Sequence, residues 1–371
     1  DMDFPCGDFI TEALQERIKH HFYGYTFPGE SLLEAVIEKA ERDYGWKIQK
    51  EWILFSNGVV DGAYNAIKAV TNGIENPGII IQPPVYYPFF NIIKKNDCCI
   101  VENPLLYKDG KYSIDFEHYE ACFKKNPLGL NPQALLLCSP HNPVGRVWTK
   151  AELEKLADIT LKNNAIIISD EIHCDIVFEP HKHIVLATLG KEVEDRSITF
   201  MAASKTFNIP GLSTSVVIIP NESLRRKYSH AQIKDYNGNI FGYIATEAAF
   251  RHGEDFRQQM LAYVRGNMDY FTAYIEKHLP QFKVINPEGT YLLWLDMREW
   301  SGIEENDGYA LHKAESLNRF ILGKCKLALD DGVIFGKQGA GFQRFNLACP
   351  RAYVEQALKQ LHEAVTAKGK L

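Results

Sequence analysis

Residues 165–173 read Ala-Ile-Ile-Ile-Ser-Asp-Glu-Ile-His, a short β-branched run that ends abruptly in polar and charged residues. Similar runs recur along the first two thirds of the chain, and helical segments such as 61–71 and 150–163 separate them. Continuously apolar strands are typical of a sheet buried on both faces, with helices as crossover connections. The pattern predicts an α/β structure with a mostly parallel central sheet and helices on both faces. The other runs are 78–81, 134–138, 197–201 and 215–219.

The pattern changes near residue 257, where long amphipathic helices and a glycine-rich stretch at 332–341 follow. A chain of 371 residues is also longer than one hydrophobic core usually serves. We therefore predict a large domain over residues 22–257 and a smaller α+β domain made of residues 1–21 and 258–371. Near the start, Ser31 and Glu34 have the spacing of a capping box, which predicts that a helix opens at Ser31. The final helix is predicted to bury one stripe, made of Val354, Leu358, Leu361 and Val365.

Composition argues for a small-molecule ligand. The net charge is -6, no block of Lys and Arg stands out, and no apolar run is long enough to span a bilayer. Nucleic acid and membrane surfaces are therefore not expected partners. The eight cysteines show no paired CxxC spacing, and several lie inside apolar runs. This usage predicts buried free thiols in a reducing compartment and hence a cytoplasmic protein.

Polar and aromatic residues follow the predicted strands. Tyr86 comes after the run at 78–81, Asn142 after 134–138, Asp170 after 165–169, and the pair Ser204 and Lys205 after 197–201. In open α/β sheets, ligands bind outside the carboxyl ends of the strands. These side chains are therefore expected to converge on one ligand.

Pyridoxal 5'-phosphate (PLP) needs this set of groups. Its aldehyde requires a lysine as a Schiff base, its ring nitrogen a carboxylate, its 3'-oxygen a donor, its ring face an aromatic side chain, and its phosphate hydroxyls and backbone N–H groups. The helix expected to open after Gly58 would offer its free N–H groups to the phosphate. The residues that match these needs are Lys205, Asp170, Asn142, Tyr86 and Ser204, with Gly58, Val59 and Val60 at the helix start.

The sequence resembles fold-type-I PLP enzymes, the aminotransferase class I/II superfamily, over nearly its whole length. The motifs that carry this resemblance lie at 142–145, 170, 204–205 and 345–351. More narrowly it is similar to the cystathionine β-lyase or cystalysin-like carbon–sulfur lyase branch. That similarity rests on Asp-Met-Asp-Phe (1–4), Gly-Val-Val (58–60), Pro-Val-Tyr (84–86), Ser-Pro-His-Asn-Pro-Val-Gly-Arg (139–146), Ser-Asp-Glu-Ile-His (169–173) and Ser-Lys-Thr-Phe-Asn-Ile-Pro-Gly (204–211).

The resemblance implies an aspartate-aminotransferase fold, a homodimer with shared active sites, and an amino-acid substrate. Tyr25 would reach the cofactor phosphate of the partner subunit. Arg351 would bind the substrate α-carboxylate, beside Asn142 and Tyr86. Lys205 would remove the Cα proton.

Two positions depart from the general aminotransferase pattern. Ser213 stands where many aminotransferases place an arginine, and His173 where they place a tyrosine. Both departures favour α,β-elimination on L-cystathionine, L-cysteine or related S-substituted cysteines, which yields a thiol, pyruvate and ammonia. The alternatives left open are an aminotransferase with the same residues and a secondary regulatory protein-binding role.

His173 admits two interpretations. We expect it to orient Asp170 through a hydrogen bond, although a half-buried structural histidine would fit the same pattern. The segment from Asp170 to His173 also has the form of a helicase DExH box. No phosphate-binding G-x-x-x-x-G-K-[ST] loop accompanies it in the sequence, so a helicase is rejected.

Overall fold

The large sheet carries the predicted apolar runs. The computed structural model describes residues 1–124, 129–233, 238–304 and 310–369. Its strands are β1 (Ile53–Ser56), β2 (Pro77–Ile81), β3 (Cys99–Glu102), β6 (Asn131–Cys138), β7 (Ile166–Asp170), β8 (Ser197–Met201) and β9 (Ser215–Ile218). They form a seven-stranded sheet in the order β1-β9-β8-β7-β6-β2-β3. Each of the five predicted runs is thus confirmed as a strand, whereas β1 and β3 were not predicted.

The direction of the strands confirms a mostly parallel sheet. The pairs from β3 through β2, β6 and β7 to β8 are all parallel. β9 runs antiparallel to both β8 and β1. β1 therefore points the same way as β8, and the carboxyl ends of six strands lie along one edge.

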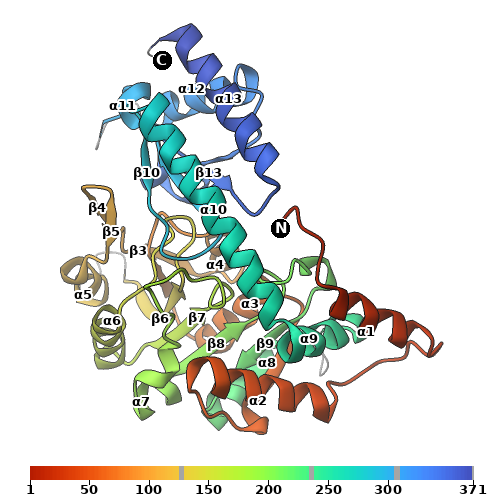
Figure 1. Cartoon of the computed structure of the whole chain (residues 1–371). Coiled ribbons are helices and arrows are strands. Elements are labelled where there is room, and N and C mark those ends of the chain that lie inside the picture. The colour runs from red at the N-terminus through yellow and green to blue at the C-terminus, as the bar shows by residue number, and fades with distance from the viewer. Residues whose placement is uncertain (125–128, 234–237, 305–309, 370–371) are drawn as a thin grey trace.

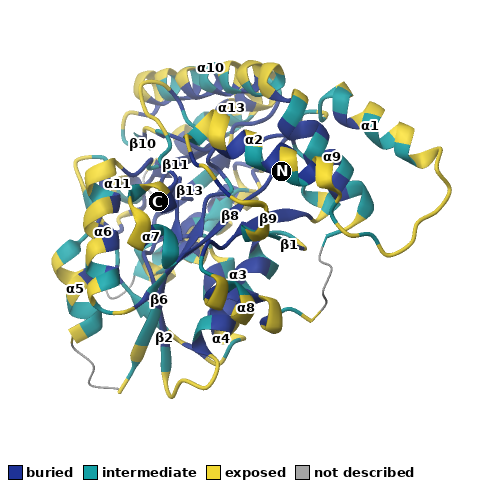
Figure 2. Cartoon of the chain, turned by 90° about the horizontal axis from the view of Figure 1, so that it is seen from below, coloured by how far each residue is buried: buried dark blue, intermediate teal, exposed yellow. Residues whose placement is uncertain are grey.

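Helices cover both faces of this sheet, as Figure 2 shows by the burial of the strands between them. One face packs against α3 (Val59–Thr71), α4 (Pro88–Lys94) and α8 (Glu222–Ala231). The other packs against α2 (Glu30–Tyr44), α5 (Phe116–Lys124), α6 (Lys150–Lys162), α7 (Lys191–Asp195) and α9 (Ile240–His252). Within β2, Ile79 and Ile81 face the α3 side and Ile80 the α6 side. This alternation explains why the run is apolar at every position.

A glycine lets α3 approach the sheet closely. A Cβ atom at Gly62 would lie 2.5 Å from Cε1 of Phe200 in β8 and 2.6 Å from Oγ of Ser56 in β1. A larger residue would push the helix away from the strands, because the core has no spare volume there. Gly62 therefore helps to fix where the first turn of α3 lies.

The C-terminal third builds a second, antiparallel sheet (Figure 1). Its order is β10-β11-β13-β12, from β10 (Lys283–Ile285), β11 (Leu292–Asp296), β12 (Asp330–Asp331) and β13 (Phe342–Asn346). Around it lie α10 (Glu254–His278), α11 (Arg298–Ser301), α12 (Ala310–Gly323) and α13 (Arg351–Lys368). The predicted stripe of α13 is confirmed, because Val354, Leu358, Leu361 and Val365 are all buried. The described helices include none with both the length and the apolar character needed to cross a bilayer.

Three smaller pieces complete the chain. β4 (Leu106–Lys108) and β5 (Lys111–Ser113) form a hairpin. The glycine-rich stretch folds into two short 3₁₀ turns, at Gly332–Phe335 and Lys337–Gly339. α1 (Asp8–Ile18) packs against α9, so it contacts the larger part of the molecule, whereas Met2 joins the core of the smaller part. The division into 22–257 against 1–21 with 258–371 stays a prediction.

The start of α2 differs from the prediction. The helix begins at Glu30 with Gly29 as its N-cap, and no side chain caps it. The capping box of Ser31 and Glu34 is therefore wrong. The hydroxyl of Ser31 instead donates to Glu247 on α9, a contact between distant segments that outcompetes the local one.

The cysteines are all free, as predicted. Five of the eight are buried, which fits their use as small apolar side chains.

Candidate active site

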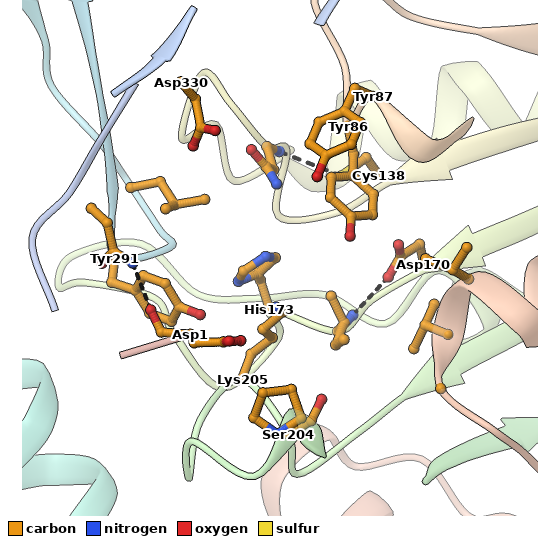
Figure 3. Close-up of a pocket in the computed structure, with 18 of the residues that line it drawn as sticks. Asp1, Tyr86, Tyr87, Cys138, Asp170, His173, Ser204, Lys205, Tyr291 and Asp330 are labelled. Carbon is orange, nitrogen blue, oxygen red and sulfur yellow. Dashed lines mark hydrogen bonds between the residues drawn. The ribbon is translucent and has the colours of Figure 1, made fainter. Parts of the chain in front are cut away.

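A cavity of about 440 Å³ lies at the carboxyl edge of the large seven-stranded sheet and faces the small sheet, which is the four-stranded antiparallel sheet of the C-terminal third. Figure 3 shows Tyr86, Asp170, His173, Ser204 and Lys205 around it. These side chains come from segments far apart in the sequence, and the parallel strands deliver them to one place. The predicted residues that line the cavity are Gly58, Val59, Val60, Tyr86, Asn142, Asp170, His173, Ser204 and Lys205.

Asp170 is the buried carboxylate of the cavity. It is the last residue of β7 and is 3% exposed. Its Oδ1 accepts one hydrogen bond, from the N–H of Ile172 at 3.1 Å. Burial raises the pKa of Asp170 to about 7, although Ile172 and the charge of Lys205 oppose the rise. A carboxylate with so few partners is suited to pair with a cationic group of a ligand.

Lys205 follows β8 and is partly buried. Burial lowers the pKa of its ammonium group, and the nearby charge of Arg344 lowers it further. A lowered pKa increases the fraction of neutral amine, the form that acts as a nucleophile or a base.

The segment that carries Lys205 is held by a buried network. The hydroxyl of Thr206 donates to Asp175 at 3.2 Å. Asp175 also accepts from Lys39 at 2.8 Å and from the hydroxyl of Tyr44 at 2.5 Å. The network fixes the backbone next to the lysine without touching the cavity's centre.

Tyr86 and Asn142 also line the cavity. Burial raises the pKa of Tyr86 to about 12, so its phenol stays protonated at neutral pH. Its ring packs edge-on against Phe89 with centroids 5.7 Å apart. Asn142 is 4% exposed, and its Oδ1 accepts from Nη1 of Arg344 at 2.8 Å. That bond leaves the NH₂ group of Asn142 to donate elsewhere.

The N-terminus of α3 borders the cavity and is suited to bind an anion. Gly58 precedes the helix with φ +96°, a backbone conformation that favours glycine. No side chain caps this helix, so the first N–H groups, at Val59 and Val60, have no capping partner. Ser204 and Ser213 also line the cavity. Free amides, a helix dipole and hydroxyls together favour phosphate.

His173 lines the cavity as predicted, but the structure does not show the hydrogen bond predicted between it and Asp170. Its ring packs edge-on against Tyr291, with centroids 5.9 Å apart. No hydrogen bond from His173 to Asp170 is found between these two described residues, and Nδ1 of His173 is buried without a partner in the described part of the chain. Burial lowers its pKa to about 3, helped by the charges of Lys205 and Arg344. The imidazole is therefore neutral, and its ring packing explains its orientation.

Arg351 lies away from the cavity. Its Nε donates to Asn267 at 2.8 Å, and its guanidinium stacks over Tyr270. The guanidinium that does line the cavity belongs to Arg344, in the middle of β13. Sequence reasoning missed it, although a charged residue inside the apolar strand Phe342–Asn346 was a usable signal.

Tyr25 is likewise absent from the lining residues. It is 85% exposed and lies in the segment between α1 and α2, which extends away from the rest of the molecule (Figure 1). Residues that line the cavity but were not predicted include Asp1, Tyr291, Asp330 and Asn346.

The donor set fits PLP. A lysine amine, a buried carboxylate with one hydrogen bond, an aromatic ring, an amide donor and an uncapped helix N-terminus meet in one cavity. Each of these groups has a counterpart on the cofactor, namely the aldehyde, ring nitrogen, ring face, ring oxygen and phosphate.

Comparison with known proteins agrees with this fit. The family model for aminotransferase class I and II matches residues 3–361. Cystathionine beta-lyase PatB of Bacillus subtilis (strain 168) is 38% identical over 370 residues, covering 99% of this chain and 91% of the relative. PLP-containing cystalysin of Treponema denticola superposes with a TM-score of 0.91 at 35% identity, covering 99% of this chain and 90% of the other. A PLP-bound C-S lyase of Staphylococcus hominis superposes with a TM-score of 0.89 at 31% identity, covering 99% and 92%. From this match over almost its whole length, and from the cavity described above, the chain belongs to the aminotransferase class I and II family.

Proposed function

We propose that this protein is a PLP-dependent carbon–sulfur β-lyase that acts on L-cystathionine, L-cysteine or a related S-substituted L-cysteine. The observation that carries the proposal is the convergence of Lys205 and Asp170 on one cavity with Arg344 on its wall. The relatives that are named as lyases support the same reaction class. The products would be a thiol, pyruvate and ammonia.

The chain's own residues would hold the cofactor. Asp170 would pair with the ring nitrogen, Tyr86 would cover the ring, and the amide of Asn142 would donate to the ring oxygen. The phosphate would lie at the N-terminus of α3, which begins with Val59 and Val60 after Gly58, and near Ser204. His173 would contribute a neutral wall beside the ring. When bound, PLP supplies an aldehyde that bonds to an amine and a ring that withdraws electrons from Cα.

Arg344 is the better candidate for the substrate α-carboxylate than Arg351. A guanidinium has five N–H donors. Three hydrogen bonds from Arg344 are accounted for, two to Oδ2 of Asp330 and one to Asn142. The two remaining donors match the two oxygens of one carboxylate.

Lys205 would act as the base. Its amine has a lowered pKa and lies in the same cavity as Arg344, so it can take the proton from Cα of a bound substrate. The Cβ–S bond then breaks, and sulfur leaves with the bonding electron pair. Water converts the remaining three-carbon fragment to pyruvate and ammonia.

The runner-up is transamination with the same residues. Ser213 supports elimination, because many aminotransferases have an arginine at this position and the cofactor phosphate would lack that arginine here. A regulatory protein-binding role stays an alternative that needs its own test, a pull-down compared between wild type and Lys205→Ala.

The proposal includes a homodimer in a reducing, cytoplasmic setting. Tyr25 and its exposed aromatic neighbours Phe22, Tyr23 and Phe27 would lie against the second subunit, with Tyr25 at that subunit's phosphate. The free buried thiols support the reducing compartment. Size-exclusion chromatography with light scattering tests the dimer, and a monomer of 42.2 kDa would contradict it.

One incubation tests the reaction. The purified, PLP-loaded protein is mixed with L-cystathionine in the absence of any keto acid, and pyruvate is measured over time. Elimination gives many equivalents of pyruvate per subunit. Transamination releases no pyruvate: it converts about one equivalent of L-cystathionine to its keto acid, with the Cβ–S bond intact, and then stops because the cofactor holds the amino group. Lys205→Ala should abolish turnover and the visible absorbance of the lysine-bound cofactor, whereas Lys95→Ala, an exposed lysine outside the cavity, should change neither.

A further inference from the structure

The wall that holds Arg344 includes a carboxylate that the reaction does not need. Asp330 in β12 lies directly opposite Arg344 in β13, as an antiparallel cross-strand pair. Its Oδ2 accepts from Nε of Arg344 at 3.1 Å and from Nη2 at 2.6 Å. Opposite charges at such a position stabilise the pair and fix the guanidinium plane.

This pairing leaves one edge of Arg344 available. The Nε–Nη2 edge faces Asp330, and the substrate carboxylate must therefore approach the Nη1–Nη2 edge. A carboxylate bound there would lie close to Asp330.

Asp330 is not fully used by this contact. Its side chain is 44% exposed, and both of its oxygens face the cavity in Figure 3. No hydrogen bond to Oδ1 of Asp330 is found among the described residues. One acceptor atom of the carboxylate is therefore free to meet a ligand.

The charges around the cavity make a cationic ligand group favourable. The side chains of the described lining residues include two cations, Lys205 and Arg344, and three carboxylates, Asp1, Asp170 and Asp330. Arg344 would be shared between the substrate carboxylate and Asp330, and His173 is neutral. No further cationic side chain of the described lining is available for a second carboxylate on the substrate.

We propose that Asp330 is a specificity-determining residue that selects S-substituted cysteines with an ammonium group on the sulfur substituent over neutral or anionic ones. This inference rests on the proposed lyase function. L-Cystathionine and L-cystine each carry a second ammonium group beyond the sulfur, which can meet Asp330, but also a second carboxylate that gains nothing from the described lining, so they rank below S-substituted cysteines whose substituent bears an ammonium group alone. Amino acids with a second carboxylate close to Cβ, the aspartate type, belong to the disfavoured class.

The test compares three substrates that differ in the charge of one group. They are S-(2-aminoethyl)-L-cysteine, the similarly sized neutral S-propyl-L-cysteine, and the anionic S-carboxymethyl-L-cysteine. We measure kcat/KM for each with the PLP-loaded wild type and with Asp330→Asn. The aminoethyl-to-propyl ratio should fall about fivefold in the variant, the upper end for a partly exposed ion pair. The carboxymethyl-to-propyl ratio should rise.

The ratios separate selection from simple positioning. If Asp330 did no more than orient Arg344, Asp330→Asn would lower all three kcat/KM values by the same factor, and the proposal would be overturned. Asp331→Asn is the matched control. Asp331 is adjacent in β12, does not line the cavity, and caps a 3₁₀ turn in a way that asparagine can reproduce.

A binding experiment keeps this inference apart from the proposed reaction. The 3-(alkylthio)propionates with the same three substituents lack the α-amino group and cannot undergo the elimination. Calorimetric titration of the loaded wild type should give the aminoethyl compound the lowest dissociation constant, and Asp330→Asn should remove that preference. Absence of pyruvate from every cysteine would refute the lyase, whereas equal dissociation constants for the three acids would refute the role of Asp330.

Discussion

Exchanging the two candidate arginines, one at a time, for lysine separates the two possible carboxylate sites. Arg344→Lys keeps the positive charge in the cavity but removes the planar fork. Two donors of Arg344 are left for a substrate carboxylate after its bonds to Asp330 and Asn142. Hydrogen bonds to charged groups contribute about 1.5–3 kcal/mol each. Losing one of them should cost about 1.5–3 kcal/mol, or roughly 10- to 150-fold in kcat/KM.

Arg351→Lys should behave differently. The guanidinium of Arg351 bonds to Asn267 and stacks on Tyr270, outside the cavity. The change should lower the free energy of unfolding by about 1 kcal/mol and leave kcat/KM within about twofold of wild type.

Pyruvate release from L-cystathionine measures kcat/KM for both variants. Visible circular dichroism checks that each binds the cofactor as wild type does, and urea denaturation checks that each is folded. A loaded, folded Arg351→Lys protein that loses as much kcat/KM as Arg344→Lys would refute the assignment of Arg344.

Three further changes test the fold and the site. Burial raises the pKa of Asp170 from 3.8 to about 7. Between pH 3.8 and about pH 7 the folded protein therefore binds more protons at Asp170 than the unfolded chain does. The contribution of Asp170 to stability falls as the pH rises through this range. Urea titrations give the unfolding free energies of the cofactor-free wild type and of Asp170→Asn at each pH from 4 to 7. The wild-type value minus the variant value should fall by up to about 4 kcal/mol as the pH rises through this range, and a rise would contradict the burial argument. Gly62→Ala should lower stability by about 1–3 kcal/mol and weaken cofactor binding, because its Cβ would meet Phe200 at 2.5 Å; an unchanged melting temperature would be inconsistent with that contact. Asp175→Ala should cost about 2–3 kcal/mol by urea denaturation, because buried Lys39 loses one of its two carboxylate partners, at 2.8 Å, and Tyr44 loses its acceptor, while Asp43 still pairs with Lys39 at 2.9 Å; a loss below about 1 kcal/mol would speak against the network.

The part of the site that the sequence predicted lies at the ends of strands. Asp170 ends β7, and Lys205 follows β8 after three small residues. A strand of a parallel sheet shows itself as an uninterrupted apolar run, and all such runs end at the same edge. The position of a residue relative to its own strand was therefore enough to bring it to the cavity.

The capping residue of α2 and the partner of His173 could not be found in this way. Ser31 has the right local spacing for a cap, yet its hydroxyl bonds to Glu247, which is 216 positions away in the sequence. His173 lies close to Asp170 in the chain, yet its ring packs on Tyr291. In both cases a contact between distant segments wins over the neighbour suggested by spacing.

By itself, then, the sequence determined the α/β sheet, the edge at which the ligand binds and most of the groups that would face a pyridoxal ring, because periodicity and strand ends are local properties of the chain. Tertiary structure alone decided which arginine enters the cavity and what lies beside it. The register of β13 against β12 and the approach of the small sheet place Arg344 next to Asp330 and next to Asn142, which is 202 residues away. Such a contact depends on how the two sheets pack together, and the residue spacing within either segment does not encode it.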